Sequence, residues 1–227
     1  MFKETDDFRL SARKVAGSAI IPGLMPSPIG HALAGVAVAW AADLVPGERE
    51  WRTAQRSASW YVKAGNGLTL ACACLAVLPD LDLVMLPFKP ETHRTVTHSV
   101  GAVLIVLLGA AIVARRSRRP VPRVSLTCAA AYATHLLLDW LGADRFPPFG
   151  LQMFWPFSDG WFISGWDVFR QTARRQLLSP AIIRLNALAI AQEMAILVPI
   201  LVALWLVRVK ALAGLATELS GRDHAAK

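Results

Sequence analysis

The sequence predicts an all-α fold, a polytopic membrane helical bundle of about four to five helices. Of its 227 residues, 55% are hydrophobic, and the mean hydropathy of +0.43 exceeds that of typical soluble globular proteins. The apolar residues gather into runs that approach the length of a membrane helix, which needs about 20 such residues. Titratable side chains collect at the ends of these runs. Together these three observations favour a membrane protein.

The apolar runs define five predicted helices, near residues 28–44, 60–79, 98–115, 124–141 and 182–208. Only the last contains a run long enough by itself to cross a bilayer, because residues 187–207 carry a single charge. The third and fourth helices need their flanking residues to reach that length. The first two runs are shorter, so these helices could instead enter the bilayer partway from one side.

The net charge of +8 and the segment RRSRRPVPR at 115–123 could suggest a nucleic-acid partner. Between two apolar helices, such a segment is more simply a cytoplasmic anchor, since cytoplasmic loops of membrane proteins are enriched in Lys and Arg. We therefore expect a multi-pass protein of the inner (plasma) membrane and no nucleic-acid partner. Loops 87–97 and 142–181 would then lie outside the cytoplasm. The sequence gives no indication of an oligomeric state.

Histidine and aspartate side chains mark one end of each of the first four predicted helices. The first helix begins with a histidine, and the second ends in LPDLD. The third begins after HRTVTHS, and the fourth ends in HLLLDW. Because successive spans run in opposite directions, these four ends lie at one membrane face, which is extracytoplasmic if the arginines are cytoplasmic. The seven residues are His31, Asp80, Asp82, His93, His98, His135 and Asp139.

The spacing and chemistry of these residues fit a metal site. His135 and Asp139 are four apart on a helix and so share a face. After Pro79, an extended turn would place Asp80 and Asp82 on one side, whereas His93 should precede the third helix. Imidazole with carboxylate suits zinc best, and manganese or iron as well. One or more divalent ions would offset carboxylates that each cost about 2.5–3.5 kcal/mol at membrane depth.

Each element of this pattern also has a simpler explanation when taken alone. His31 could cap a helix, and LPDLD could be a helix stop with a solvated turn. His135 and Asp139 could be a hydrogen-bonded pair that joins two helices. A metal site explains all of these residues at one face with a single cause, whereas the simpler reading needs a separate explanation for each segment.

The motifs resemble those of the YdjM-like family of predicted membrane-bound metal-dependent hydrolases. They are HALAG at 31–35, LPDLD at 78–82, HRTVTHS at 93–99, HLLLDW at 135–140 and FWPFS at 154–158. The resemblance covers roughly residues 28–160. It implies that the seven residues above are metal ligands and that Arg94 lies beside the metal or contacts substrate. It also implies a membrane-embedded hydrolase domain over 25–210, preceded by an extension at 1–24, dispensable if translation starts at Met25, and followed by a polar tail at 211–227.

If a metal is bound, hydrolysis by a metal-activated water is the simplest chemistry. The candidate catalytic residues are Asp82 or Asp139 as general base and Arg94 as a contact to an anionic substrate. Arg94 could instead form an ion pair with Glu91 or with an aspartate of the site. Residues 146–166 hold three tryptophans and five phenylalanines. They could form an aromatic belt at the headgroups or a groove for an acyl chain, so membrane lipids and a lipid or lipid-linked phosphoester are the expected partners.

Other functions use the same residues differently. A metal-ion or small-solute transporter would have polar residues spread through the membrane depth, and such proteins often contain internal repeats. We find no internal repeat in this sequence, and its candidate ligands gather at one end of the helices. A non-catalytic membrane scaffold would hold a structural metal in a closed ligand set. Peptide or amide hydrolysis stays open, although no HExxH motif is present. Glu193, inside the fifth predicted helix, could be functional or could hydrogen-bond across helices.

Overall fold

The computed structural model describes residues 23–24, 26–45, 65–85, 93–145, 147–173 and 176–225. Over these residues the fold is all-α, as predicted, apart from one pair of two-residue strands, β1 (Gly23–Leu24) and β2 (Thr172–Ala173), which pair antiparallel. Two 3-10 segments, η2 (Leu78–Met85) and η4 (Val96–His98), lie next to helix ends. The α-helices are α2 (Pro28–Ala42), α4 (Gly67–Val77), α5 (Val100–Arg116), α6 (Val121–Leu141) and α7 (Pro180–Ala225).

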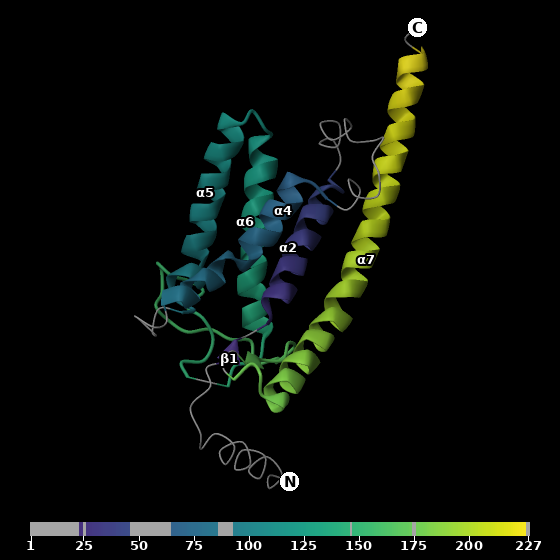
Figure 1. Ribbon diagram of the computed structural model, residues 1–227. Helices are drawn as coiled ribbons and strands as arrows, with labels where there is room; N and C mark the ends of the chain where they lie inside the picture. The colour runs from purple at the N-terminus through teal and green to yellow at the C-terminus, as the bar shows by residue number, and fades with distance from the viewer. Residues whose placement is uncertain are drawn as a thin grey trace.

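Helix α6 is the centre of the bundle, where it packs against α5, α4 and α2, while α7 packs against the other side of α2 (Figure 1). The start of α2, the end of α4, the start of α5 and the end of α6 all lie toward the lower end of the molecule in this view. The loop between α5 and α6, which contains the arginine-rich segment, lies at the opposite end. The predicted convergence of four helix ends is therefore present in the fold.

Local sequence signals explain where most of these helices begin and end. The Asn66 side chain accepts hydrogen bonds from the backbone nitrogens of Leu68 and Thr69 and so caps α4. Ser99 caps α5 by accepting from Ala102 N. The second helix was expected over 60–79; residues 60–64 lie outside the described residues, and the α-helix begins only at Gly67 and gives way to η2 at Leu78.

Helix α7 is longer than predicted. It was expected over 182–208, but it runs from Pro180 to Ala225. Residues 209–225 contain alanine, leucine and charged helix formers and no proline, so nothing in them interrupts the helix. The segment 211–227, predicted as a polar tail, therefore continues the helix through Ala225.

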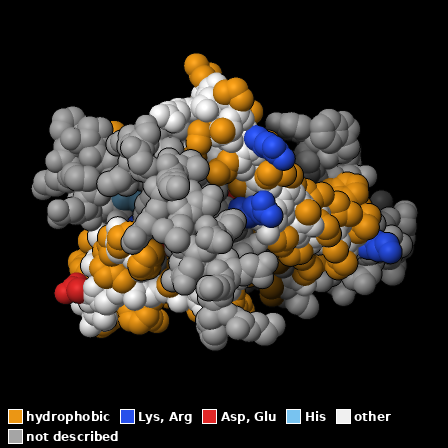
Figure 2. Space-filling view, turned by 90° about the horizontal axis from the view of Figure 1, so that it is seen from below, with side chains coloured by type: hydrophobic (Ala, Val, Ile, Leu, Met, Phe, Trp, Pro, Cys, Tyr) orange, Lys and Arg blue, Asp and Glu red, His pale blue; other side chains and the backbone are white. Residues whose placement is uncertain are grey.

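Three described helical segments are long and apolar enough to cross a membrane: Gly67–Val84, Val121–Leu141 and Pro180–Ala211. Helix α2 is apolar but has only 15 residues, which corresponds to about 22 Å. The short first run thus gives a short helix, as its length suggested. Seen from the lower end, the described surface is largely hydrophobic with scattered Lys and Arg side chains (Figure 2). Cys72, Cys74 and Cys128 are free thiols, as expected.

The contact between α2 and α4 depends on Gly35. A Cβ atom at this position would overlap the backbone oxygen of Cys72 and lie 2.8 Å from the Cβ of Ala76. We expect Gly35→Ala to force the two helices apart and to lower the free energy of unfolding by about 1–3 kcal/mol, the usual cost of overpacking. Denaturation in mixed detergent micelles would measure this loss.

Gly109→Ala in α5 is the matched control, because nothing lies within 4 Å of a Cβ at Gly109. It should leave stability unchanged or raise it slightly, since alanine favours a helix over glycine by about 1 kcal/mol. Equal stability of the two variants would contradict the close packing of α2 on α4.

Candidate metal centre

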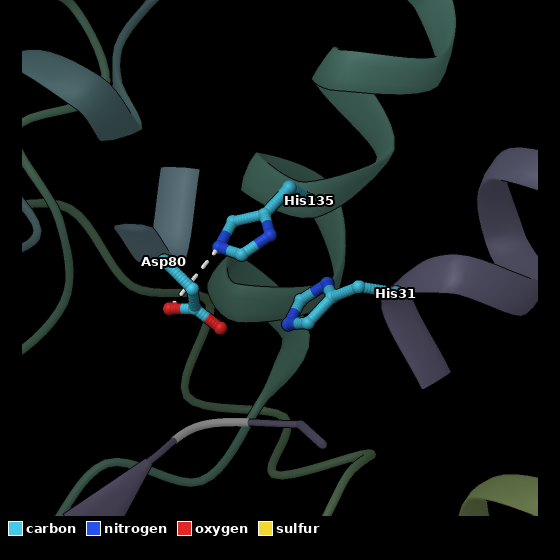
Figure 3. Close-up of side chains that lie close together, drawn as sticks. All are labelled: His31, Asp80 and His135. Atoms are coloured by element: carbon cyan, nitrogen blue, oxygen red, sulfur yellow. Dashed lines mark ion pairs between the residues drawn. The ribbon is translucent and has the colours of Figure 1, made fainter. Parts of the chain in front are cut away.

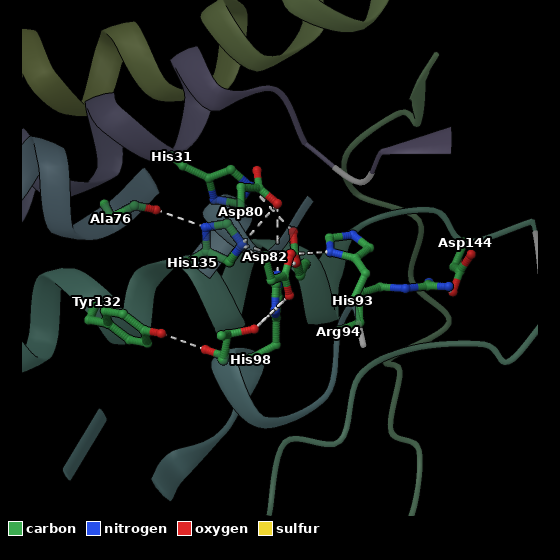
Figure 4. Close-up of polar contacts among 12 residues, drawn as sticks. His31, Ala76, Asp80, Asp82, His93, Arg94, His98, Tyr132, His135 and Asp144 are labelled. Carbon is green, nitrogen blue, oxygen red and sulfur yellow. Dashed lines mark hydrogen bonds and ion pairs between the residues drawn. The ribbon is translucent and has the colours of Figure 1, made fainter. Parts of the chain in front are cut away.

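Five of the seven predicted ligands meet in one buried cluster. His31 comes from the first turn of α2, and His135 and Asp139 come from the last turns of α6. Asp80 comes from η2 and His98 from η4. Three of these side chains point toward one another from three separate elements in Figure 3, and Figure 4 shows the wider network. The three histidines of this cluster are at most 1% exposed.

Asp139 is the central carboxylate of the cluster. Its Oδ1 lies 3.3 Å from His31 Nε2, and its Oδ2 lies 3.3 Å from His135 Nε2 and 3.6 Å from His98 Nε2. Asp80 Oδ1 lies 3.8 Å from the Nε2 atoms of both His98 and His135. Two ligands on one tetrahedral cation with bonds of about 2.0–2.1 Å are themselves about 3.3–3.4 Å apart. The separations around Asp139 are close to this value, whereas those of Asp80 are longer by about 0.4 Å.

The hydrogen bonds of two histidines assign the protons on their rings. His135 Nδ1 lies 2.8 Å from the carbonyl oxygen of Ala76, which can only accept, so Nδ1 carries the hydrogen. Thr97 Oγ1 donates to Asp82 Oδ2 and lies 3.0 Å from His98 Nδ1, so this nitrogen also donates. The two Nε2 atoms face each other at 3.1 Å. With both rings neutral, two lone pairs would face each other, so the geometry requires a positive charge between them.

The cluster also contains polar atoms without hydrogen bonds. Among the described residues, Asp80 Oδ2, Asp139 Oδ1 and His31 Nδ1 are buried and make none. Buried polar atoms are nearly always hydrogen-bonded, because leaving one unpaired costs about 1–3 kcal/mol. Carboxylate oxygens directed into a group of imidazole nitrogens are suitable ligands for a divalent cation. The residues present therefore fit a metal ion.

Asp82 and His93 form a pair that borders this cluster, and His93 stays a candidate ligand because its ring nitrogen lies within 4.8 Å of ligand atoms of Asp80 and His98. Asp82 Oδ1 lies 2.7 Å from His93 Nδ1, while Asp82 Oδ2 accepts from Thr97 Oγ1 at 2.6 Å and lies 3.4 Å from His98 Nδ1. His93 lies in the turn before η4, as expected from its spacing. Both oxygens of Asp82 are thus engaged by side chains that also border the cluster.

The expectation that Asp80 and Asp82 share one side of an extended turn is wrong. Residues 78–85 form the 3-10 helix η2, and with three residues per turn, positions two apart point in different directions. Asp80 therefore faces Nε2 of His98, and Asp82 faces Nδ1 of the same ring. This helical turn places the imidazole between the two carboxylates.

Arg94 forms an ion pair with Asp144, in the segment that follows α6. Asp144 also accepts from Gly150 N at 2.7 Å, and the carbonyl oxygen of Arg94 accepts from Gln152 N at 2.9 Å. The Arg94 guanidinium carbon lies 6.0 Å from the ring of Trp161. Arg94 thus links the histidine loop to the aromatic segment through an ion pair with Asp144, which is not one of the predicted ligands. Glu91, one of the alternative partners, lies outside the described residues.

Sequence reasoning missed several residues that orient the cluster. Thr97 bridges Asp82 and His98, and the hydroxyl of Tyr132 donates to the Thr97 carbonyl oxygen at 2.6 Å. Thr97 precedes His98 directly, and Tyr132 lies one helical turn before His135, so proximity in sequence was the available signal. For Asp144 no comparable signal existed, because its partner lies 50 residues earlier.

Comparison with known proteins gave one match. No curated protein and no solved structure matches the chain. The profile of the YdjM inner membrane proteins matches residues 25–215, which include every residue of the cluster and all the predicted helices. With its long apolar helices, the chain is therefore a membrane protein that belongs to the YdjM inner membrane protein family.

Proposed function

We propose that this chain is a multi-pass, membrane-bound metal-dependent hydrolase that acts on a lipid or lipid-linked phosphoester. The observation that best supports this proposal is that Nε2 of His98 and Nε2 of His135 lie 3.1 Å apart. Beside them, Asp80 and Asp139 each have one buried oxygen that makes no hydrogen bond among the described residues. The cluster contains three imidazoles and two carboxylates whose lone pairs converge on one region. A shared proton would join only two of these groups, whereas a metal cation can bind several of them.

The proposed ligands are His31, His98, His135, Asp80 and Asp139. A divalent cation held by them would lower the pKa of water toward about 7 and polarise a scissile phosphoester. The carbonyl oxygen of Ala76 fixes the ring of His135, and Thr97 with Asp82 fixes the ring of His98. Partners of this kind set the direction of a ligand's lone pair and raise its basicity.

His93 and Asp82 are the best candidates for moving a proton. The carboxylate of Asp82 lies 2.7 Å from Nδ1 of His93 and orients the ring, so that its other nitrogen could take a proton and return it. The His93 side chain is 13% exposed, whereas those of His98 and His135 are completely buried. His93 is thus less deeply buried than these two ligands, which suits a group that exchanges protons with a substrate. Asp82 would then act through His93.

The surroundings of the cluster support the proposed substrate class. Residues 153–155 of the aromatic segment are hydrogen-bonded to the start of α5. Val100 N donates to Met153 O at 2.7 Å, and Gly101 N donates to Trp155 O at 3.0 Å. In the same region, Phe157 is 79% exposed and Trp166 is 72% exposed. Exposed aromatic side chains of this kind are typical of the headgroup region, which supports a substrate that resides in the bilayer.

We expect the purified protein to hydrolyse a member of a panel of phospholipids and polyprenyl phosphates, and a chelator to abolish this activity. His93→Ala should lower turnover by about 10²–10⁴, the usual contribution of a general acid or base, while the metal content measured by elemental analysis stays at the wild-type level. Loss of metal in this variant would instead make His93 a ligand. Turnover that survives complete chelation would contradict the proposal.

One observation favours a second candidate, a scaffold with a structural metal. The five proposed ligands are all buried, and Asp80, the most exposed of them, is only 8% exposed. A closed ligand set of this kind is typical of structural sites. In that case chelation would lower the thermal stability of the protein, and no substrate of the panel would be hydrolysed.

A further inference from the structure

Glu193 is a buried carboxylate of α7 that is not part of the metal cluster. It is 0% exposed, and both of its oxygens contact one residue of another element. Oε1 accepts from the backbone nitrogen of Ser27 at 2.6 Å, and Oε2 accepts from the Ser27 hydroxyl. Ser27 is the N-cap of α2, and its hydroxyl also accepts from Gly30 N. The predicted hydrogen bond across helices is therefore present, and it ends at the first turn of α2.

The fit of this carboxylate against α2 is close. A Cβ atom at Gly30 would lie 2.7 Å from Glu193 Oε2, so any side chain there would displace the carboxylate. The carbonyl oxygen of Ser27 also accepts a hydrogen bond from the backbone nitrogen of His31 at 3.1 Å. Glu193 is thus connected, through one residue, to the backbone of a proposed metal ligand.

His31 needs this support more than the other histidines of the cluster. The rings of His98 and His135 are oriented by hydrogen bonds at Nδ1, whereas Nδ1 of His31 has no hydrogen-bond partner among the described residues. The His31 ring stacks on His135 with centroids 3.8 Å apart. Its position therefore depends on that stacking, on the contact of its Nε2 with Asp139 Oδ1 at 3.3 Å, and on where the backbone of α2 begins.

A second polar contact keeps α7 aligned with α2. At the C-terminal end of α2, Arg208 Nε, from the middle of α7, donates to Asp43 Oδ2 at 2.6 Å. Glu193 and Arg208 are 15 positions apart and Ser27 and Asp43 are 16 apart, which correspond to about 22 and 24 Å along a helix. The matching spacings hold the two neighbouring helices in a fixed register (Figure 1).

We infer that Glu193 is a positioning residue of the metal centre: by holding Ser27 and the start of α2, it sets the place of His31. This inference rests on the proposed function, because it presupposes a bound metal. The partial positive charge at the N-terminus of a helix also attracts the carboxylate oxygens toward the first turn of α2. Glu193 does not contact the metal cluster itself.

The test uses Co²⁺ bound to the full-length protein in detergent, because the absorption spectrum of Co²⁺ reports its ligands. We expect Glu193→Ala to change the spectrum in the same way as His31→Ala and to weaken Co²⁺ binding about 10–100-fold, as for other groups that orient a ligand. Glu193→Gln can still accept from Ser27 N, so it should keep the wild-type spectrum. The double variant His31→Ala/Glu193→Ala should bind Co²⁺ no more weakly than His31→Ala alone.

Gln192→Ala is the matched control. Gln192 precedes Glu193 on α7, but its side chain donates to Val168 O and accepts from Arg170 N, so the wild-type spectrum should persist. If Glu193→Ala does not fold, Ser27→Ala removes one of the two contacts and should give a smaller shift in the same direction. A wild-type spectrum in both Glu193→Ala and Ser27→Ala would overturn the inference. So would a double variant whose loss of Co²⁺ affinity equals the sum of the losses in His31→Ala and Glu193→Ala. Absence of Co²⁺ binding in the wild type would reject the metal centre as well.

Discussion

Replacing Asp139 with asparagine is expected to remove the bound metal from the purified protein. The substitution preserves the shape of the side chain but removes the charge that lies within 3.3–3.6 Å of His31, His98 and His135. Asp80 would then be the one carboxylate that faces the Nε2 atoms of His98 and His135, since Asp82 contacts His98 at Nδ1. Loss of a group that only orients a ligand costs about 10–100-fold in metal affinity, so loss of this central ligand should cost at least about 100-fold. Elemental analysis and competition with a chelator would measure the change.

Asp159→Asn is the matched control for this experiment. It makes the same chemical change at an exposed carboxylate in the aromatic segment, so metal content should stay at the wild-type level. If Asp139→Asn retains both the stoichiometry and the affinity of the wild type, the cluster does not bind metal in the way proposed, and the hydrolase mechanism loses its basis.

The convergence of the cluster was predictable because it depends on chain direction alone. Apolar runs of membrane length must alternate in direction, so ligands at a start, an end, a start and an end meet at one end of a bundle. The pairing of His135 with Asp139 followed from helical spacing, and the position of His93 before η4 followed from its distance from His98. These features need no knowledge of packing.

The partners of individual side chains were not predictable, because tertiary contacts decide them. The 3-10 geometry of η2 places Asp82 against His93 and Thr97, although an extended turn would have placed it beside Asp80. Glu193 and Ser27 are 166 positions apart, and no periodicity in the sequence connects them. The interior of α7 identified the glutamate as unusual but did not indicate which helix it binds.

The two ends of the bundle contain different kinds of buried charge. At the lower end, carboxylates and imidazoles face one another with oxygens that lack hydrogen bonds. At the opposite end, the carboxylate of Asp43 is bonded by two arginines, with donor distances of 2.6 and 2.7 Å. An arginine satisfies a carboxylate directly, whereas the His and Asp groups at the lower end could hold a metal ion. The contrast supports a functional role for one end and a structural role for the other.

Replacing Asp43 with alanine is expected to destabilise the protein more than any other single change outside the metal centre. Asp43 has a fully buried side chain that accepts from Arg123 and Arg208, which are 2% and 3% exposed. The contacts join the end of α2 to α6 and α7. Removing one partner from a buried ion pair leaves uncompensated charge and typically costs about 3–5 kcal/mol. Denaturation in mixed detergent micelles would measure the lost free energy of unfolding.

Arg145→Ala provides the contrasting case, because it breaks an ion pair with Asp167 in which the arginine side chain is 67% exposed. Exposed pairs contribute about 0–1 kcal/mol, so its unfolding should resemble that of the wild type. Asp43 lies one helix length, about 22 Å, from the His31 end of α2. The folded fraction of Asp43→Ala should therefore keep its metal. Wild-type stability in this variant would show that the arginines find other partners, and loss of metal without loss of stability would mean that the two ends of the bundle are coupled.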